Sequence, residues 1–504
     1  MVLHGNDVFP TLQSCTRLAT DQTLFDVQFW PFGTNDDDQI FAVTGATDTI
    51  ICRPQLRSFP PFEVLRWFRD ESEQVIKLVH TCTRGDGHIT KVAQDNASAS
   101  LNSLAWTQDP VTQKPWICVA GDEHKHIKIL DIESGNVARV LSGHGGAIND
   151  LCVSPISTSL LASCANDSTI RLWNLEPSHQ EQPCVALLAG EGHKAPILAI
   201  EFHPNGKWLL SGGIDTAVCL WAVPDAAALE RNDHSPAAKP LIVYYPHFYT
   251  EELHPNYVDC FGWYGDLIIS KAARDQVDAS KDIYSNEILL WKIEGFDADE
   301  PPAEDPPIPE AGYSTRSSFP HDEDFRGFAR LLTMNIPHTD RFYHRFGLLH
   351  ADGMRPILCM GDQETRFSFW DLQRFEEGID PLDRPSNKPR KKGGRKKKEP
   401  NVLGELRRSE SIASGSSPNQ TPDASSTIAS STTGPEGREY TLSDRFTPLA
   451  PHYSVTANTD LTRINGKERH FATSQIAWSP DGTWMVTVGD MGMICMFHRD
   501  KSVV

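Results

Sequence analysis

The chain has 504 residues, of which 39% are hydrophobic and 23% are charged, a composition that is ordinary for a folded protein with a large core. Its formal net charge of −20 argues against broad nucleic-acid binding by the folded body, because phosphates would be repelled, and favours basic partners; a solvated acidic surface is the plain alternative. No apolar run approaches 18 residues, and the start MVLHGNDVFP lacks the apolar segment of a signal peptide, so we expect no membrane span and no secretion.

Short apolar strands recur along the chain, each preceded by a second strand and a tight turn. They are expected at residues 48–52, 126–132, 169–175, 217–223, 287–293, 366–372 and 493–499. Residues near 11–20 are expected to add an outer strand to the last unit, which leaves no open sheet edge. The pattern predicts seven units closed into a ring.

Two of these units carry a fuller signature, in which a Gly-His pair precedes a strand-ending Trp. His144 precedes Trp173 by 29 residues and His193 precedes Trp221 by 28, a spacing typical of a WD40 blade. In each unit a turn Asp can accept a hydrogen bond from the His, and a Ser can link the His to the Trp. This predicts two structural networks, His144, Ser163, Asp167 and Trp173, and His193, Ser211, Asp215 and Trp221. The predicted fold class is all-β, a seven-bladed WD40 β-propeller with long disordered insertions.

One propeller is expected over residues 11–504, with insertions at 53–72, 294–312 and 376–440. The first insertion has a possible helix at 62–69, and the second is acidic and Pro-rich. The third begins with a basic run, which has eight positive charges and no negative one between Ser386 and Lys398, and continues into a Ser/Thr-rich stretch. Such a composition cannot bury enough apolar surface to order itself. The basic run is a nuclear-import signal, a local nucleic-acid patch or a solvated charge cluster.

Catalytic and metal-binding motifs are absent from the sequence. There is no Gly-rich phosphate loop, no HExxH and no GxSxG, and the eleven cysteines form no CxxC pair. We therefore expect no enzyme activity, no metal and no cofactor, and read the cysteines as reduced, mostly buried thiols of an intracellular protein. Because some propellers are enzymes, a propeller enzyme stays open as an alternative.

Three sequence motifs are more specific than the generic repeat: TLFDVQFW at 23–30, HPNYVDCFGWYGDLIISK at 254–271 and DRFYHRF at 340–346. Together with the two full repeats, they resemble the extra sex combs (EED) family of Polycomb proteins. The long basic and Ser-rich insertion suggests a fungal member. The resemblance covers all seven units and leaves the insertions unmatched.

The resemblance implies a nuclear, non-catalytic core subunit of Polycomb repressive complex 2. Its partners would be a SET-domain histone methyltransferase, which acts on lysine 27 of histone H3, a VEFS-type zinc-finger subunit and a trimethylated histone H3 peptide. The propeller would bind the methyl mark, scaffold the methyltransferase and stimulate it allosterically, giving heritable gene silencing. Nucleic-acid binding would be limited to the basic insertion.

The family's methyl-lysine cage, carried over by resemblance, falls on Phe25, Phe342 and Tyr343. The position of a fourth family aromatic holds Asn102, so the cage is three-sided, or another aromatic such as Trp30 fills in, or affinity is lower. Phe25 could instead be a core strand residue.

By the same resemblance Asn149, Asp259 and Arg345, with Tyr257 beside them, would line the mouth of the central channel and contact the peptide. Turn and strand-end hydrogen bonding is the alternative role for these residues. For the whole protein, a generic WD40 scaffold such as a ubiquitin-ligase substrate adaptor is the alternative function.

Overall fold

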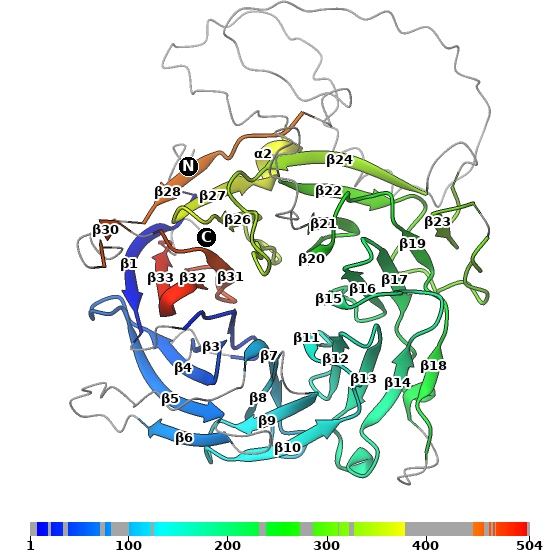
Figure 1. Cartoon of the computed structure of the whole chain (residues 1–504), viewed down its shortest axis with the longest axis horizontal. Helices are drawn as coiled ribbons and strands as arrows, with labels where there is room; N and C mark the ends of the chain where they lie inside the picture. Colours follow the sequence, from blue (N-terminus) through cyan, green and yellow to red (C-terminus); the bar gives the residue numbers. More distant parts are fainter. Residues whose placement is uncertain are drawn as a thin grey trace, which may run out of the picture.

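The computed structural model describes residues 8–18, 22–33, 39–70, 76–81, 100–121, 125–230, 238–272, 286–310, 312–321, 327–377, 447–457, 463–464, 467–468 and 470–500. Seven sheets, antiparallel apart from the strand β18 (Leu241–Val243), stand around a central axis as the blades of a propeller (Figure 1), which confirms the predicted fold class. All seven expected strands are present as the third strand of their blades. The predicted long basic and Ser-rich segment lies almost wholly outside the described residues.

Each blade has four strands, ordered from the axis outward. Blade 1 is β2 (Asp26–Phe29), β3 (Phe41–Gly45), β4 (Asp48–Pro54) and β5 (Phe62–Asp70); blade 2 is β7 (Leu101–Gln108), β8 (Pro115–Gly121), β9 (His126–Asp131) and β10 (Val137–Ser142). Blade 3 is β11 (Ile148–Val153), β12 (Leu160–Ala165), β13 (Ile170–Asn174) and β14 (Cys184–Leu188); blade 4 is β15 (Ile197–Phe202), β16 (Trp208–Gly213), β17 (Val218–Ala222) and β19 (Phe248–Thr250). Blade 5 is β20 (Val258–Tyr264), β21 (Leu267–Ala272), β22 (Glu287–Ile293) and β24 (Phe328–Asn335); blade 6 is β25 (Gly347–Leu349), β26 (Ile357–Gly361), β27 (Arg366–Asp371) and β28 (Tyr453–Thr456).

The seventh blade joins the two ends of the chain. Its inner strands are β31 (Thr473–Trp478), β32 (Trp484–Gly489) and β33 (Met493–His498), and its outer strand is β1 (Thr11–Arg17). β1 pairs antiparallel with β33, with Thr11 opposite His498 and Arg17 opposite Met493. The predicted outer strand near residues 11–20 is therefore confirmed. It closes the ring because the sheet of the last blade is completed by the first strand of the chain.

Three blades carry a fifth strand at their outer edge, and a few small elements lie in the connections between strands. The fifth strands are β6 (Ile76–Thr81) on β5, β18 (Leu241–Val243), parallel to β14, and β23 (Thr315–Ser317) on β19. The remaining elements are the β29 (Arg463–Ile464) and β30 (Lys467–Glu468) pair, the helices α1 (Ala226–Leu229) and α2 (Leu372–Glu376), and the 3-10 turns η2 (Pro177–His179) and η5 (Asp490–Gly492).

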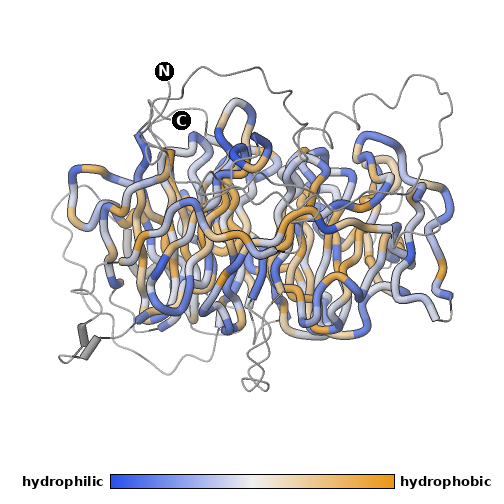
Figure 2. Tube along the Cα trace, turned by 90° about the horizontal axis from the view of Figure 1, so that it is seen from above, coloured by the Kyte–Doolittle hydropathy of each residue, from blue (hydrophilic) through white to orange (hydrophobic). Residues whose placement is uncertain are grey.

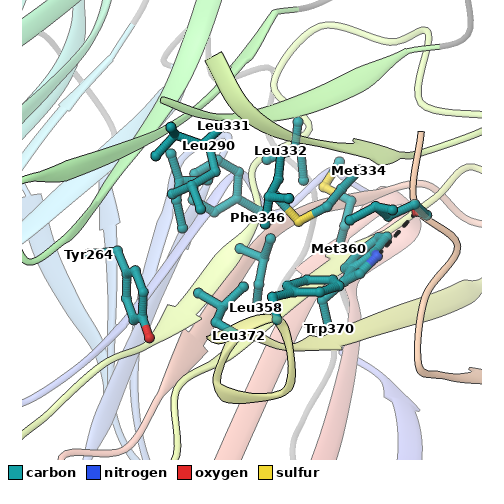
Figure 3. Packing of buried hydrophobic residues seen from close by; sticks show 14 of the residues in the cluster. Tyr264, Leu290, Leu331, Leu332, Met334, Phe346, Leu358, Met360, Trp370 and Leu372 are labelled. Atoms are coloured by element: carbon teal, nitrogen blue, oxygen red, sulfur yellow. Dashed lines mark hydrogen bonds between the residues drawn. The ribbon is translucent and has the colours of Figure 1, made fainter. Parts of the chain in front are cut away.

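The hydrophobic core lies between adjacent blades. Seen from the side, apolar segments fill the middle of the disc and polar turns gather at its two faces (Figure 2). Between blades 5 and 6, a cluster that includes Leu290, Met334, Phe346, Leu358 and Trp370 is buried (Figure 3). Trp370 Nε1 donates to the carbonyl of Leu449 at 3.4 Å, so its one polar atom is satisfied. Each fully buried side chain of this size contributes about 1.5–3 kcal/mol by removal from water.

Residues 62–70 are a strand, so the expected helix at 62–69 was wrong. β5 pairs along its length with β4, and Trp67 Nε1 donates to Asp48 Oδ1 at 2.9 Å. Aromatic and β-branched residues recur along β5, a composition that packs well on a sheet, and pairing with β4 satisfies the backbone. The stretch 53–72 is therefore largely the fourth strand of blade 1 rather than an insertion.

The acidic, Pro-rich stretch 294–312 contains no helix or strand among its described residues, as expected for an extended loop. Its start is nevertheless anchored: Phe296 and Ala298 are buried, and the carbonyl of Ala298 accepts from Trp208 Nε1 at 3.2 Å. The third expected insertion, 376–440, follows the end of α2, and residues 378–446 lie outside the described residues.

Candidate functional site

The predicted site residues lie where the innermost strands begin. Each blade repeats the same strand order, and each innermost strand lies beside those of neighbouring blades, for example β11 beside β7 and β15. The innermost strands therefore run in one direction around the axis, and their first residues share one face, which we call the rim. Phe25 directly precedes β2, Tyr257 directly precedes β20, and Asn102 and Asn149 are the second residues of β7 and β11.

Aromatic rings from three distant parts of the chain meet at the rim. Tyr343 packs edge-on against Phe25, with ring centroids 5.8 Å apart, and against Phe342 at 4.1 Å. Phe342 in turn contacts Tyr257 at 5.6 Å. Phe342 is 40% exposed and Phe25 and Tyr343 are partly exposed, so their rings remain accessible to a ligand. We call Phe25, Phe342, Tyr343 and Tyr257 the aromatic cluster.

The backbone at Tyr343 is in the left-handed region, with φ of 61°. A bulky side chain is rare in this conformation, where Gly or Asn costs less, and strain of this kind gathers at binding sites. The loop lies between the Asn335 end of β24 and the start of β25, and it puts two consecutive aromatic residues at one place. Neighbouring strand residues could not do this, because they face opposite sides of a sheet.

Two contacts of one residue anchor the chain segments that carry the aromatic cluster. Asp490, in the turn η5 of the last blade, forms an ion pair with Arg341 and accepts from Thr23 Oγ1 at 3.2 Å. Arg341 directly precedes Phe342, and Thr23 lies two residues before Phe25. Asp490 thus ties both halves of the cluster to the seventh blade. No sequence signal indicated this residue, since its partners lie 149 and 467 positions away.

Asn102 lies against the aromatic cluster but not as a wall of it. Its side-chain Nδ2 donates to the hydroxyl of Tyr343 at 3.0 Å, and the residue is 5% exposed. The amide therefore supports Tyr343 from the side. Trp30 does not fill the fourth position: it packs edge-on against Phe32 and Trp106, at the opposite end of β2 from Phe25.

The predicted polar residues Asn149, Asp259 and Arg345 are engaged within the chain. Asn149 Nδ2 donates to the carbonyl of Ile197 at 2.6 Å and to Asn166 Oδ1 at 2.9 Å. Asp259 is fully buried in an ion pair with Lys271 Nζ at 3.0 Å. The structure thus gives each of these two a partner inside the propeller, which agrees with the strand-end role left open for them.

Arg345 lies beneath Tyr343 at the centre of a charged group. Its guanidinium donates to Asp150 Oδ1 at 2.8 Å and to the carbonyl of Leu198 at 3.1 Å, and lies 5.9 Å from the centroid of the Tyr343 ring. Burial raises the pKa of Asp26 to about 6 against the opposing effect of Arg345, and burial with the nearby charge of Asp150 raises the pKa of Glu201 to about 8. At neutral pH Glu201 is therefore mostly uncharged, and the carboxylates of Asp26 and Asp150 face the single guanidinium, which suits a cationic ligand at the rim.

Both predicted WD networks are hydrogen-bonded in the expected order. In blade 3, His144 Nδ1 donates to Asp167 Oδ2 at 3.0 Å, and Trp173 Nε1 and His144 Nε2 meet on Ser163 Oγ at 2.8 and 2.7 Å. In blade 4, the corresponding distances are 3.0 Å between His193 Nδ1 and Asp215 Oδ1, and 2.9 and 2.8 Å from Trp221 Nε1 and His193 Nε2 to Ser211 Oγ.

The acids of the two networks are held ionised. Burial raises the pKa of Asp215, but the hydrogen bond from His193 and the backbone N–H groups of Lys194 and Ala217 outweigh it and bring the pKa below its usual value. Hydrogen bonds from His144, Thr169 and the Gly145 amide do the same for Asp167. In each network the side-chain hydrogen bonds stay within one blade, so the role of these residues is structural.

Blade 5 has a similar His–Ser–Trp arrangement that sequence reasoning missed. His254 Nε2 and Trp291 Nε1 meet on Ser270 Oγ at 2.7 and 2.9 Å. Two departures hid this network: His254 follows Leu253 rather than Gly, and residues 273–286 between β21 and β22 lengthen the His-to-Trp spacing to 37. Ser and Trp are 21 residues apart in this network and 10 residues apart in the other two. A sequence search that allowed for the longer spacing would have found it.

The chain is similar to Polycomb proteins in both sequence and structure. A model described as WD domain, G-beta repeat matches residues 135–174 and 183–222. Over 361 residues the chain is 35% identical to Polycomb protein EED of Chaetomium thermophilum, covering 70% of this chain and 57% of that protein. It is 27% identical over 310 residues to Polycomb protein esc of Drosophila melanogaster, covering 58% of this chain and 63% of that protein. The chain belongs to the extra sex combs (EED) family of Polycomb proteins.

Chains in solved structures of Polycomb repressive complex 2 have the same fold. One is the crystal structure of the Chaetomium thermophilum Polycomb repressive complex 2, with a TM-score of 0.71 and 28% identity over 97% of this chain and 98% of that chain. Another is the structure of ctPRC2 in complex with H3K27me3 and H3K27M, also with a TM-score of 0.71 and 28% identity over 97% and 98%. The aligned sequence of the two curated relatives spans less than two thirds of their length, whereas these structural matches extend over nearly the whole chain.

Two further findings bear on the kind of site. Among the described residues, no group of three or more His, Cys, Asp or Glu side chains is placed to hold a metal ion. In the same residues, no helix has the length and hydropathy needed to cross a membrane.

Proposed function

We propose that this chain is a non-catalytic WD40 subunit of a Polycomb repressive complex 2 and that its rim binds trimethylated lysine of a histone H3 tail. One observation carries the binding proposal: Phe25, Phe342 and Tyr343, far apart in sequence, meet at the rim with accessible rings. Membership of the EED family supports the assignment to the complex. The nuclear location of the chain belongs to the same proposal.

The chemistry of the aromatic cluster suits a quaternary ammonium. A trimethylated lysine has no N–H donor, so it loses no hydrogen bond when it leaves water for an aromatic site. Each ring face attracts the cation by about 0.5–2 kcal/mol, depending on how well the site is desolvated. An unmethylated lysine would lose strong hydration and find no acceptor among the three rings. Discrimination between the two lysines therefore rests on the rings.

Electrostatics favour a basic ligand over the whole rim. The chain has a net charge of −20, and the group below the rim contains the carboxylates of Asp26 and Asp150 beside Arg345. This field raises the local concentration of a basic histone tail and speeds its association, an effect that falls with ionic strength.

The proposal includes two protein partners, a SET-domain histone methyltransferase and a VEFS-type zinc-finger subunit. In it, the propeller scaffolds the methyltransferase acting on lysine 27 of histone H3, and occupancy of the rim stimulates that enzyme. The similarity to chains of Polycomb repressive complex 2 structures supports these partners. Stimulation further requires that the peptide-bound rim favours an active arrangement of the methyltransferase.

The test is a titration of the full chain with a histone H3 peptide trimethylated at lysine 27 and with its unmethylated twin. We expect saturable binding of the first and at least tenfold weaker binding of the second. Affinity purification from nuclear extract should recover a SET-domain methyltransferase. Equal affinity for both peptides would refute the reader function, and recovery of a ubiquitin ligase in place of the methyltransferase would favour the generic adaptor.

A further inference from the structure

Two cysteines face each other across the strand pair that closes the ring. Cys15 lies on β1 and Cys495 lies directly opposite on β33. Their sulfur atoms are 2.8 Å apart, so the two thiols are in contact. Both are buried, at 3% and 0% exposure, within the hydrophobic cluster between blades 6 and 7.

The register of the two strands places these cysteines where a disulfide fits. The amide of Leu18 donates to the carbonyl of Gly492 at 2.9 Å, and hydrogen-bonded pairs alternate with non-bonded pairs along an antiparallel ladder. Counting three positions back from Leu18, the Cys15–Cys495 pair is a non-hydrogen-bonded one. In such pairs the Cα atoms are about 4.5 Å apart and the side chains are closest, which is inside the range of about 4.4–6.8 Å that a disulfide spans.

We propose that Cys15 and Cys495 are a site of intramolecular disulfide formation that closes the propeller covalently. The inference stands on the strand register and the sulfur contact and does not rest on the proposed histone binding. The oxidant is a low-molecular-weight disulfide such as oxidised glutathione. The thiolate of one cysteine attacks it and releases one glutathione thiol; the second thiolate then attacks the mixed disulfide and releases the other. Two protein thiols and one glutathione disulfide give one protein disulfide and two glutathione thiols.

The rate of this reaction depends on opening of β1. Burial raises the pKa of Cys495 well above its usual value, so in the closed seam Cys495 is a thiol and not the reactive thiolate. β1 is the outermost strand of its blade, and Thr11, Gln13 and Arg17 on it are exposed. When this strand separates from β33, both thiols reach water together, and burial no longer holds Cys495 in its protonated form. The disulfide therefore forms slowly in the native chain and then prevents β1 from leaving.

The closing seam is continuous with the rim. Arg17 Nε donates to the carbonyl of Met491 at 2.9 Å, and the amide of Leu24, next to Phe25, donates to the carbonyl of Gly489 at 3.0 Å. Between these two acceptors lies Asp490, which binds Arg341. A disulfide at the seam would thus hold β33 and the support of the aromatic cluster in register.

The test uses the full chain, incubated with oxidised glutathione or with a phosphine reductant, alkylated and digested with trypsin. Cys15 and Cys495 fall in separate tryptic peptides, 1–17 and 470–499, each with one cysteine. We expect the oxidised sample to contain these two peptides joined, with a mass two hydrogens below their sum, and the reduced sample to contain them apart. Recovery of both peptides fully alkylated from the oxidised sample, or of each bound only to glutathione, would overturn the proposal.

Thermal melting provides the second measurement. A cross-link over a separation of 480 residues removes much of the freedom of the unfolded chain, so oxidation should raise the melting temperature by several degrees, reversibly with reductant. C15S and C495S should each abolish the oxidation-dependent shift. The matched control is C359S, because Cys359 is buried in the same cluster and should leave the shift in place. If the serine variants do not fold, the peptide analysis of the unmodified chain decides alone.

Discussion

Replacing Tyr343 by alanine should remove one wall of the proposed methyl-lysine site and leave the propeller folded. The ring contacts Phe25 at 5.8 Å and Phe342 at 4.1 Å, and its hydroxyl accepts from Asn102. Tyr343 lies in a loop at the surface of the rim, partly exposed, so its removal opens no large cavity in the core. The change therefore separates binding from stability better than Phe25→Ala would.

The expected magnitude follows from the chemistry of one ring. A single aromatic face contributes about 0.5–2 kcal/mol to a bound ammonium. Since about 1.4 kcal/mol corresponds to a tenfold change, Tyr343→Ala should weaken the trimethylated peptide roughly 2- to 30-fold. Tyr343→Phe keeps the ring and loses only the hydrogen bond to Asn102, so its affinity should stay close to that of the unmodified chain.

The assay is calorimetric titration with the trimethylated and unmethylated peptides, each variant first checked by thermal melting. Tyr313→Ala is the matched control, because Tyr313 is an aromatic residue 73% exposed and outside the aromatic cluster. The ratio of the two peptide affinities is the decisive quantity. If Tyr343→Ala leaves this ratio unchanged while the chain remains folded, the ring does not face the methyl group and the site assignment is refuted.

Three other substitutions test the WD network of blade 4, the buried charged group and the support of the aromatic cluster. Asp215→Ala should cost about 1–3 kcal/mol of stability, because the His193 donor loses its acceptor. Since the pKa of Asp215 is lowered in the folded chain, the stabilisation by its carboxylate is present above the usual value of 3.8 and disappears as the pH falls below it. The melting temperatures of the unmodified chain and the variant should therefore converge in acid. Glu201→Gln should raise the melting temperature above pH 8 and leave it unchanged below pH 4.5, because burial raises the pKa of Glu201 in the folded chain to about 8. The unmodified chain therefore loses stability between pH 4.5, where Glu201 ionises in the unfolded chain, and pH 8. Asp490→Ala should weaken peptide binding several-fold without contacting the peptide, because Arg341 loses its partner; unchanged affinity would show that the rim holds its shape alone.

The blades could be predicted from sequence because their chemistry is local. A turn Asp, a short apolar strand and a terminal Trp lie within about ten residues of each other, so Asp167 and Trp173 are enough to predict their blade without any distant part of the chain. The strand β5 was misread because its apolar residues do not alternate strictly with polar ones: Val64 and Leu65 are consecutive, and so are Trp67 and Phe68. Only pairing with β4, through Trp67 and Asp48, decides between them.

The site was harder to predict, because its parts meet only after the ring closes. The resemblance supplied Phe25, Phe342 and Tyr343, and the structure brings them together. The way Asn102 meets Tyr343, side by side through a hydrogen bond, depends on the distance between two innermost strands, which no local pattern encodes. The alternative in which Trp30 fills the fourth position failed for the same reason: β2, a strand of four residues, separates Trp30 from Phe25 and places it at the other face.

Closure of the ring by β1 and β33 also sets an order for making the protein. β1 emerges from the ribosome first, but its partner Cys495 is translated 480 residues later. At roughly 5–20 residues per second, the first strand waits about 25–95 s before it can pair. During that time the open edge of a nascent propeller is available to other strands. A chain cut short before Asp490 would lack both β33, which closes the ring, and the residue that supports the rim, so unfinished copies would fold most of their blades without forming the proposed methyl-lysine site.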